Sequence, residues 1–119
     1  MATLANQGVA TQASFGQLGS AFSDGATGAY IPPAGSVVVA ITCLADTNFD
    51  VLTPETTGTC FGILAGSGVG TRGDLVDADN LFPQGITIYG RWTNVEIGAE
   101  STKGVILYLG PSNSPNQTA

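Results

Sequence analysis

The chain has 119 residues, a formal net charge of -6 and only 10% charged residues, against about 25% in an average globular protein. This length supports one hydrophobic core and one domain. With three basic residues, Arg72, Arg91 and Lys103, the chain lacks the positive charge that drives nucleic-acid binding, so we expect neither DNA nor RNA as a partner. The uncharged surface favours association with other proteins, and the alternative is a monomer covered by Thr, Ser, Asn and Gln.

The chain opens without a basic segment, and its longest apolar run, residues 37–45, is far shorter than the roughly 20 residues of a membrane span. We therefore expect neither a signal peptide nor a membrane span. Cys43 and Cys60 would then lie in a reducing compartment, which favours two buried free thiols. A disulfide between Cys43 and Cys60 is the alternative if their strands are neighbours.

Residues 1–29 are rich in Gly, Ala, Ser, Thr and Gln and contain few residues to bury. Phe15, Leu18 and Phe22 have the spacing of a helical stripe, but two glycines in the same window each disfavour a helix by about 1 kcal/mol. We predict an extended N-terminal arm that uses these three side chains as anchors on a partner. A disordered terminus is the alternative.

Residues 30–110 are predicted to form the β domain, which begins at the rigid Ile31-Pro-Pro sequence. Short apolar runs with strand composition are separated by turn residues, and they lie at residues 36–44, 49–53, 59–65, 86–97 and 104–109. We predict an all-β fold, a small antiparallel β-sandwich or partly open, jelly-roll-like barrel. Residues 111–119 are a polar, proline-containing tail.

The period-two pattern of residues 86–97 contains a slip of one residue. Ile88 and Trp92 are even-numbered, whereas Val95 and Ile97 are odd-numbered, so we predict a bulge at Thr93-Asn94. Trp92 then belongs to the core. Tyr89 and Arg91 have the opposite parity, and we expect them to be exposed at an interface, where Tyr and Arg are enriched.

Two of the predicted strands are apolar on both faces. In residues 36–44 strict alternation puts Val37, Val39, Ile41 and Cys43 on one face and the apolar residues between them on the other. In residues 104–109, Ile106 and Tyr108 oppose the apolar residues of the other parity. Because one face of a small antiparallel sheet usually meets water, both strands need a second cover, which is a loop, the arm or another subunit. Ile106 and Tyr108 therefore join the predicted interface.

No residue pattern predicts catalysis or a cofactor. The chain has no histidine, which excludes Ser-His-Asp and Cys-His catalysis, and two cysteines do not make a structural zinc site. The Gly-rich stretch from Gly66 lacks the Lys-Ser/Thr ending of a phosphate loop. Asp74, Asp77 and Asp79 are interpreted as a solvated acidic loop; their spacing fits no calcium-binding loop, and whether they bind a cation stays open.

Three segments resemble small virion proteins of tailed bacteriophages, especially marine and cyanobacterial ones. They are Ser36-Val-Val-Val-Ala-Ile-Thr-Cys-Leu-Ala-Asp-Thr-Asn-Phe-Asp-Val-Leu-Thr-Pro-Glu, Phe82-Pro-Gln-Gly-Ile-Thr-Ile-Tyr-Gly-Arg-Trp-Thr-Asn-Val and Gly104-Val-Ile-Leu-Tyr-Leu-Gly. The resemblance implies a non-enzymatic capsid decoration or cement protein. Such a protein is made in the host cytoplasm, forms homotrimers and binds the major capsid protein on the outer surface of the virion. The alternatives are a head fibre base, a tail or head-closure component, and a carbohydrate-binding module on the capsid surface.

Overall fold

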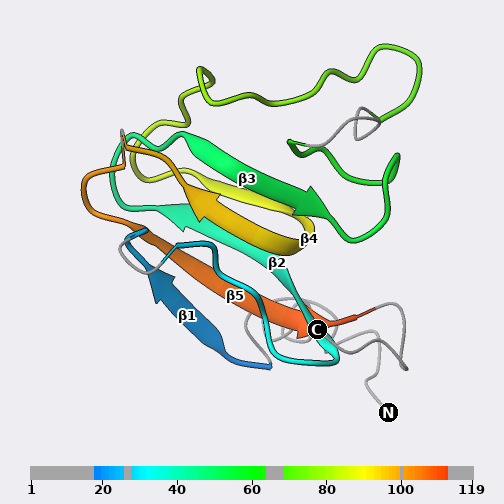
Figure 1. Cartoon of the computed structure of the whole chain (residues 1–119), viewed down its shortest axis with the longest axis horizontal. Helices are drawn as coiled ribbons and strands as arrows, with labels where there is room; N and C mark the ends of the chain where they lie inside the picture. The colour runs from blue at the N-terminus through cyan, green and yellow to red at the C-terminus, as the bar shows by residue number, and fades with distance from the viewer. Residues whose placement is uncertain (1–17, 26–27, 64–68, 100, 113–119) are drawn as a thin grey trace, which may run out of the picture.

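The computed structural model describes residues 18–25, 28–63, 69–99 and 101–112. These residues form one five-stranded sheet of β1 (Ser20–Ser23), β2 (Ser36–Cys43), β3 (Phe49–Pro54), β4 (Thr87–Ile97) and β5 (Val105–Pro111). The strand order is β1-β5-β2-β4-β3, and every pair of neighbours is antiparallel (Figure 1). No helix occurs within the described ranges, so none there could cross a membrane. The predicted all-β, antiparallel fold is confirmed.

Strand β1 forms one edge of the sheet and belongs to the segment predicted to be an arm. It pairs with β5 from Ser20 opposite Tyr108 to Ser23 opposite Val105. Residues 20–23 of that segment are therefore part of the sheet. Its residues 1–17, which include Phe15, and 26–27, together with residues 113–119 of the predicted tail, lie outside the described residues.

The inner face of the sheet carries the core, because residues directly opposite one another on neighbouring strands share a face. One row across four strands contains Ala21, Leu107, Ile41 and Ile88, and the next row joins Ser23, Val105 and Cys43. Apart from Ala21 and Ser23 on the edge strand, these side chains are at most 8% exposed. We call this surface the core face.

Loops, rather than a second sheet within the described residues, cover the core face. Tyr30, Ile63 and Phe82 reach it through isolated bridges to Val95, Leu52 and Thr47 respectively. The ring of Phe61 meets that of Trp92 edge-on with centroids 5.4 Å apart, and Phe82 meets Phe49 in the same way at 5.4 Å. Trp92 is fully buried, as predicted. These loops supply one of the two covers that the doubly apolar strands require.

The predicted slip in β4 is present. Asn94 pairs with Thr53 and Trp92 with Pro54, so Thr93 is an extra residue that returns Val95 to the core face. A second irregularity, between Val38 and Ala40 in β2, was not predicted. It places Val38 with Ile41 and Cys43 in the core, so strict alternation along this strand is wrong. The unbroken apolar run from Val37 to Ile41 gives no period-two pattern around Val39, so the sequence does not reveal this bulge.

The segment predicted as a strand at residues 59–65 is reduced, in its described part, to the single bridge between Ile63 and Leu52. Gly62 explains how close this segment runs to β3, because a Cβ there would lie 2.4 Å from the Leu52 carbonyl oxygen. Cys43 and Cys60 are both buried and free, which confirms the expected pair of thiols.

Candidate binding face

The second face of the sheet is formed by two cross-strand rows that alternate with those of the core. One row contains Phe22, Ile106, Thr42 and Thr87, and the other contains Ser20, Tyr108, Ala40 and Tyr89. Each row runs over β1, β5, β2 and β4 in that order. We call these eight residues the open face. Four of the seven predicted interface residues, Phe22, Tyr89, Ile106 and Tyr108, belong to it.

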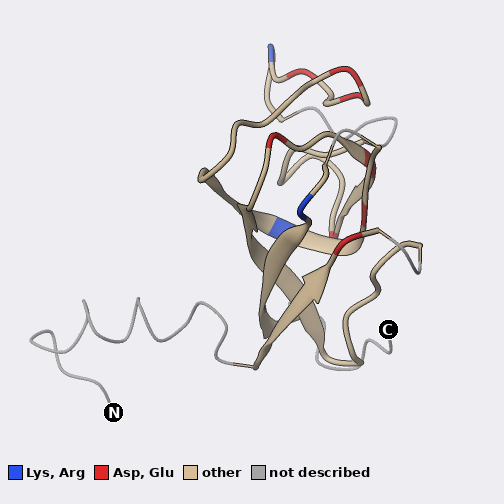
Figure 2. Ribbon diagram, turned by 90° about the vertical axis from the view of Figure 1, so that its left-hand side faces the viewer, with Lys and Arg blue, Asp and Glu red and all other residues tan. Residues whose placement is uncertain are grey.

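The open face combines exposure with a lack of charge. Phe22 is 60% exposed and Tyr89 is 58% exposed, while Ile106 and Tyr108 are half-buried. None of the eight residues is charged, although the chain carries a net charge of -6. In Figure 2 the acidic segments lie in the upper and middle parts of the view, in loops and on strands, and the lower ends of the strands are tan. An exposed apolar surface without charge is typical of a surface that binds another molecule.

Leu18 lies at the β1 edge of this face. Its backbone N–H donates a hydrogen bond to the Leu109 carbonyl oxygen at 3.3 Å, which holds it beside the end of β5. Its side chain is 52% exposed. Leu18 and Phe22 are therefore two exposed apolar residues along the edge of the sheet that β1 forms.

A groove of about 190 Å³ lies in the open face between Tyr89 and Tyr108. Ala40, Thr42 and Thr87 complete its lining. The two threonine Oγ1 atoms are hydrogen-bonded to each other at 2.8 Å across β2 and β4. The groove thus has aromatic sides and a floor of one alanine and two threonine side chains, which carry three methyl groups and two hydroxyl groups. Sequence reasoning missed Ala40, Thr42 and Thr87, because their shared face with the tyrosines depends on strand order and on the bulge near Val39.

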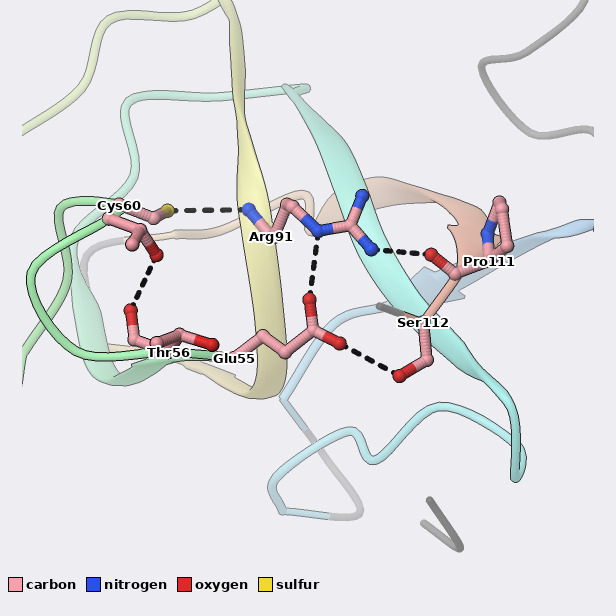
Figure 3. Close-up of polar contacts among 7 residues, drawn as sticks. Glu55, Thr56, Cys60, Arg91, Pro111 and Ser112 are labelled. Atoms are coloured by element: carbon pink, nitrogen blue, oxygen red, sulfur yellow. Dashed lines mark hydrogen bonds and ion pairs between the residues drawn. The ribbon is translucent and has the colours of Figure 1, made fainter. Parts of the chain in front are cut away.

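Arg91 was predicted to be at the interface, but the structure uses it elsewhere. Its Nε donates to Glu55 Oε1 at 2.8 Å, and a terminal guanidinium nitrogen donates to the Pro111 carbonyl oxygen (Figure 3). Ser112 Oγ donates to the other Glu55 oxygen at 2.8 Å. We call these four residues the clasp. Because β2 lies between β4 and β5, the Arg91 side chain reaches across one strand and ties the end of β5 to the end of β3.

Cys60 lines a second cavity, of about 460 Å³, together with Phe61, Tyr89 and Gly90 among others. Its Sγ accepts the Arg91 backbone N–H at 3.3 Å and donates to the Phe61 carbonyl oxygen at 3.3 Å. Burial raises the pKa of the Cys60 thiol, against a smaller lowering by Arg91, and burial also raises the pKa of Cys43. Both thiols therefore stay protonated near neutral pH and are poor nucleophiles.

The acidic residues of the long loop serve its own turns. Asp77 Oδ1 accepts the backbone N–H of Asp79 at 2.8 Å, and Asn80 Oδ1 accepts the backbone N–H of Asp77 at 2.9 Å. Within the described residues, no group of three or more His, Cys, Asp or Glu side chains is placed to hold a metal ion.

Comparison with known proteins gives no match to any family model, to any curated protein or to any solved structure.

Proposed function

We propose that this chain is a structural virion protein that decorates and stabilises the outside of a tailed-phage capsid, as a homotrimer bound to the major capsid protein. In this proposal it acts by binding rather than by catalysis. The β1 edge of the open face, with Leu18 and Phe22, is the part that contacts the capsid. The proposal combines this surface with the resemblance of three sequence segments to small phage virion proteins.

The observation that carries the proposal is the separation of charge from exposed apolar surface. The described acidic side chains lie off the eight residues of the open face, and Phe22 on that face is 60% exposed. Such a surface loses few charge–water contacts when a protein covers it. The remaining acidic surface stays in water and favours the outside of a capsid over its DNA-lined interior.

The β1 edge favours a repetitive, multivalent mode of binding. Within the described residues, this edge consists of a four-residue strand with two exposed large apolar side chains, Leu18 and Phe22. A stable interface buries roughly 800 Å² per partner. A trimer presents three such edges at once, and their combined avidity exceeds that of a single edge. A weak contact repeated by symmetry is what a clamp on a capsid lattice requires.

The direct test is saturable binding of the purified full chain to expanded capsids that lack it. Bound protein is quantified by gel densitometry against the major capsid protein. We expect many copies per particle, in proportion to the capsomers. Binding at about a dozen copies would favour a tail or head-closure role, and no binding at all would remove the capsid proposal.

Matched variants locate the contact. Leu18→Ala and Phe22→Ala together should weaken capsid binding at least about tenfold, which corresponds to about 1.4 kcal/mol. Leu81→Ala is the control, because Leu81 is as exposed as Leu18, at 51% against 52%, but lies in the loop before β4. Equal binding by the double variant and the control would place the contact away from the β1 edge. Light scattering of the free protein tests the trimer.

A further inference from the structure

Tyr108, Ala40 and Tyr89 stand in one cross-strand row over β5, β2 and β4, so a single methyl group separates two tyrosine side chains. Side chains of a strand stand roughly perpendicular to the sheet, and two strand spacings amount to about 10 Å. That spacing leaves room for one ring-sized group in contact with both tyrosines at about 3.5 to 4 Å. The groove is therefore a slot for a ring rather than a flat surface.

The lining of the slot is mostly apolar and uncharged, and its polar groups on the floor are the hydroxyl groups of two threonines. The bond between Thr42 Oγ1 and Thr87 Oγ1, at 2.8 Å, uses one of the two hydroxyl hydrogens. One O–H and the remaining lone pairs therefore stay available to a ligand. Aromatic sides suit the C–H surface of a ligand, and the threonine hydroxyls suit its polar rim. A pyranose ring has both.

The lack of charged residues in the groove restricts the class of ligand further. The five lining residues include no Asp, Glu, Lys or Arg, and the chain's net charge of -6 repels anions. At about 190 Å³ the groove is smaller than the roughly 300 Å³ at which pockets for drug-sized ligands begin, so it holds a single ring of a longer molecule.

From this geometry we propose that the groove between Tyr89 and Tyr108 binds one sugar ring of a neutral oligosaccharide. This binding goes beyond the capsid role proposed above and does not depend on it. It occupies the β5–β2–β4 part of the open face, whereas the capsid contact lies at the β1 edge. Affinity is weak, because one ring makes few contacts, and repetition on a multivalent particle strengthens it.

The test is an NMR titration of the ¹⁵N-labelled full chain at millimolar ligand concentrations. The probes are neutral tetrasaccharides of glucose, mannose, galactose and N-acetylglucosamine, and a proline-rich peptide is the competing probe. At least one saccharide should shift the amide signals of Ala40, Thr42, Thr87, Tyr89 and Tyr108. Shifts there with the peptide alone, shifts only elsewhere, or no shifts with any probe would each overturn the proposal.

Variants separate stacking from unspecific contact. Tyr89→Ala should weaken saccharide binding at least about tenfold, whereas Tyr89→Phe, which keeps the ring, should bind within about threefold of the parent. Phe22→Ala is the control in the neighbouring row and should bind like the parent. Tyr89→Ala should leave capsid binding unchanged, so failure of one proposal is distinguishable from failure of the other. Saccharide binding that is equal in all three variants would also overturn the proposal.

Discussion

The core face and the open face are made by the same four strands, with side chains one residue apart, yet most of their side chains differ in exposure. Leu107 on the core face is fully buried, while its neighbours Ile106 and Tyr108 on the open face are only half-buried. Loops cover the first face, and no described segment supplies a comparable cover for the second. An apolar side chain in this sheet therefore stabilises the fold on one face and remains available for binding on the other.

The largest expected contrast comes from shortening adjacent side chains of β5. Leu107→Ala removes a fully buried side chain from the core and should lower the free energy of unfolding by about 3 kcal/mol. Ile106→Ala, one residue away on the open face, should lower it by about 1 kcal/mol or less. Urea denaturation of both variants measures the difference. Equal losses would mean that the open face is packed as tightly as the core.

The sequence predicts the core face better than the open face, and the reason is physical. Buried positions of a strand are apolar at every second residue. Trp92, Val95 and the slip at Thr93 could therefore be recognised from the sequence pattern alone. Membership of the open face depends on which strands are neighbours. The order β1-β5-β2-β4-β3 brings residues 22, 42, 87 and 106 into one row, and no local pattern encodes such long-range pairing.

Arg91 illustrates a second limit of sequence reasoning. Its parity and its residue type favour an exposed interface position, as they do for Tyr89. The structure instead pairs it with Glu55, 36 residues away in the chain and on another strand connection. A sequence with nine acidic residues offers too many possible partners for this pairing to be predicted. The groove could not be predicted from the sequence for the same reason, because its two tyrosines come from β4 and β5, which are not adjacent in the sheet.

An intermediate effect is expected at the clasp, which is polar but largely buried. The Glu55 side chain is 5% exposed and that of Arg91 is 33% exposed. Glu55→Ala leaves the guanidinium without its carboxylate and Ser112 Oγ without its acceptor, and should cost about 2 kcal/mol after allowance for the exposure of Arg91.

The clasp is tested by denaturation alongside a control, Glu96→Ala, which removes a half-buried carboxylate of β4 that has no ion pair within the described residues. The control should lose less than about 0.5 kcal/mol. A double-mutant cycle with Arg91→Met isolates the pair itself. A coupling energy near zero would show that the clasp only fills space.

The smallest predicted effect is a loss of stability at alkaline pH. It tests whether the buried surroundings of the two thiols exclude charge. Burial raises the pKa of Cys43 and Cys60 above the ordinary value of 9.0. A group with a raised pKa in the folded state contributes full stability below its unfolded pKa and loses it as pH rises through the folded pKa. Unfolding free energy should therefore begin to fall near pH 9.

The measurement is the slope of unfolding free energy against pH between about 8 and 10, because the pKa of Tyr30 is also raised by burial and that phenol contributes above pH 10. Replacing both cysteines by alanine should flatten the slope, whatever it does to the stability at pH 7. The variant Leu81→Ala, which changes no titratable group, should keep the parent slope in this range. If the double cysteine variant also keeps the parent slope, ionisation of the two thiols does not destabilise the fold. Water would then reach the thiols, which would contradict the close packing around them.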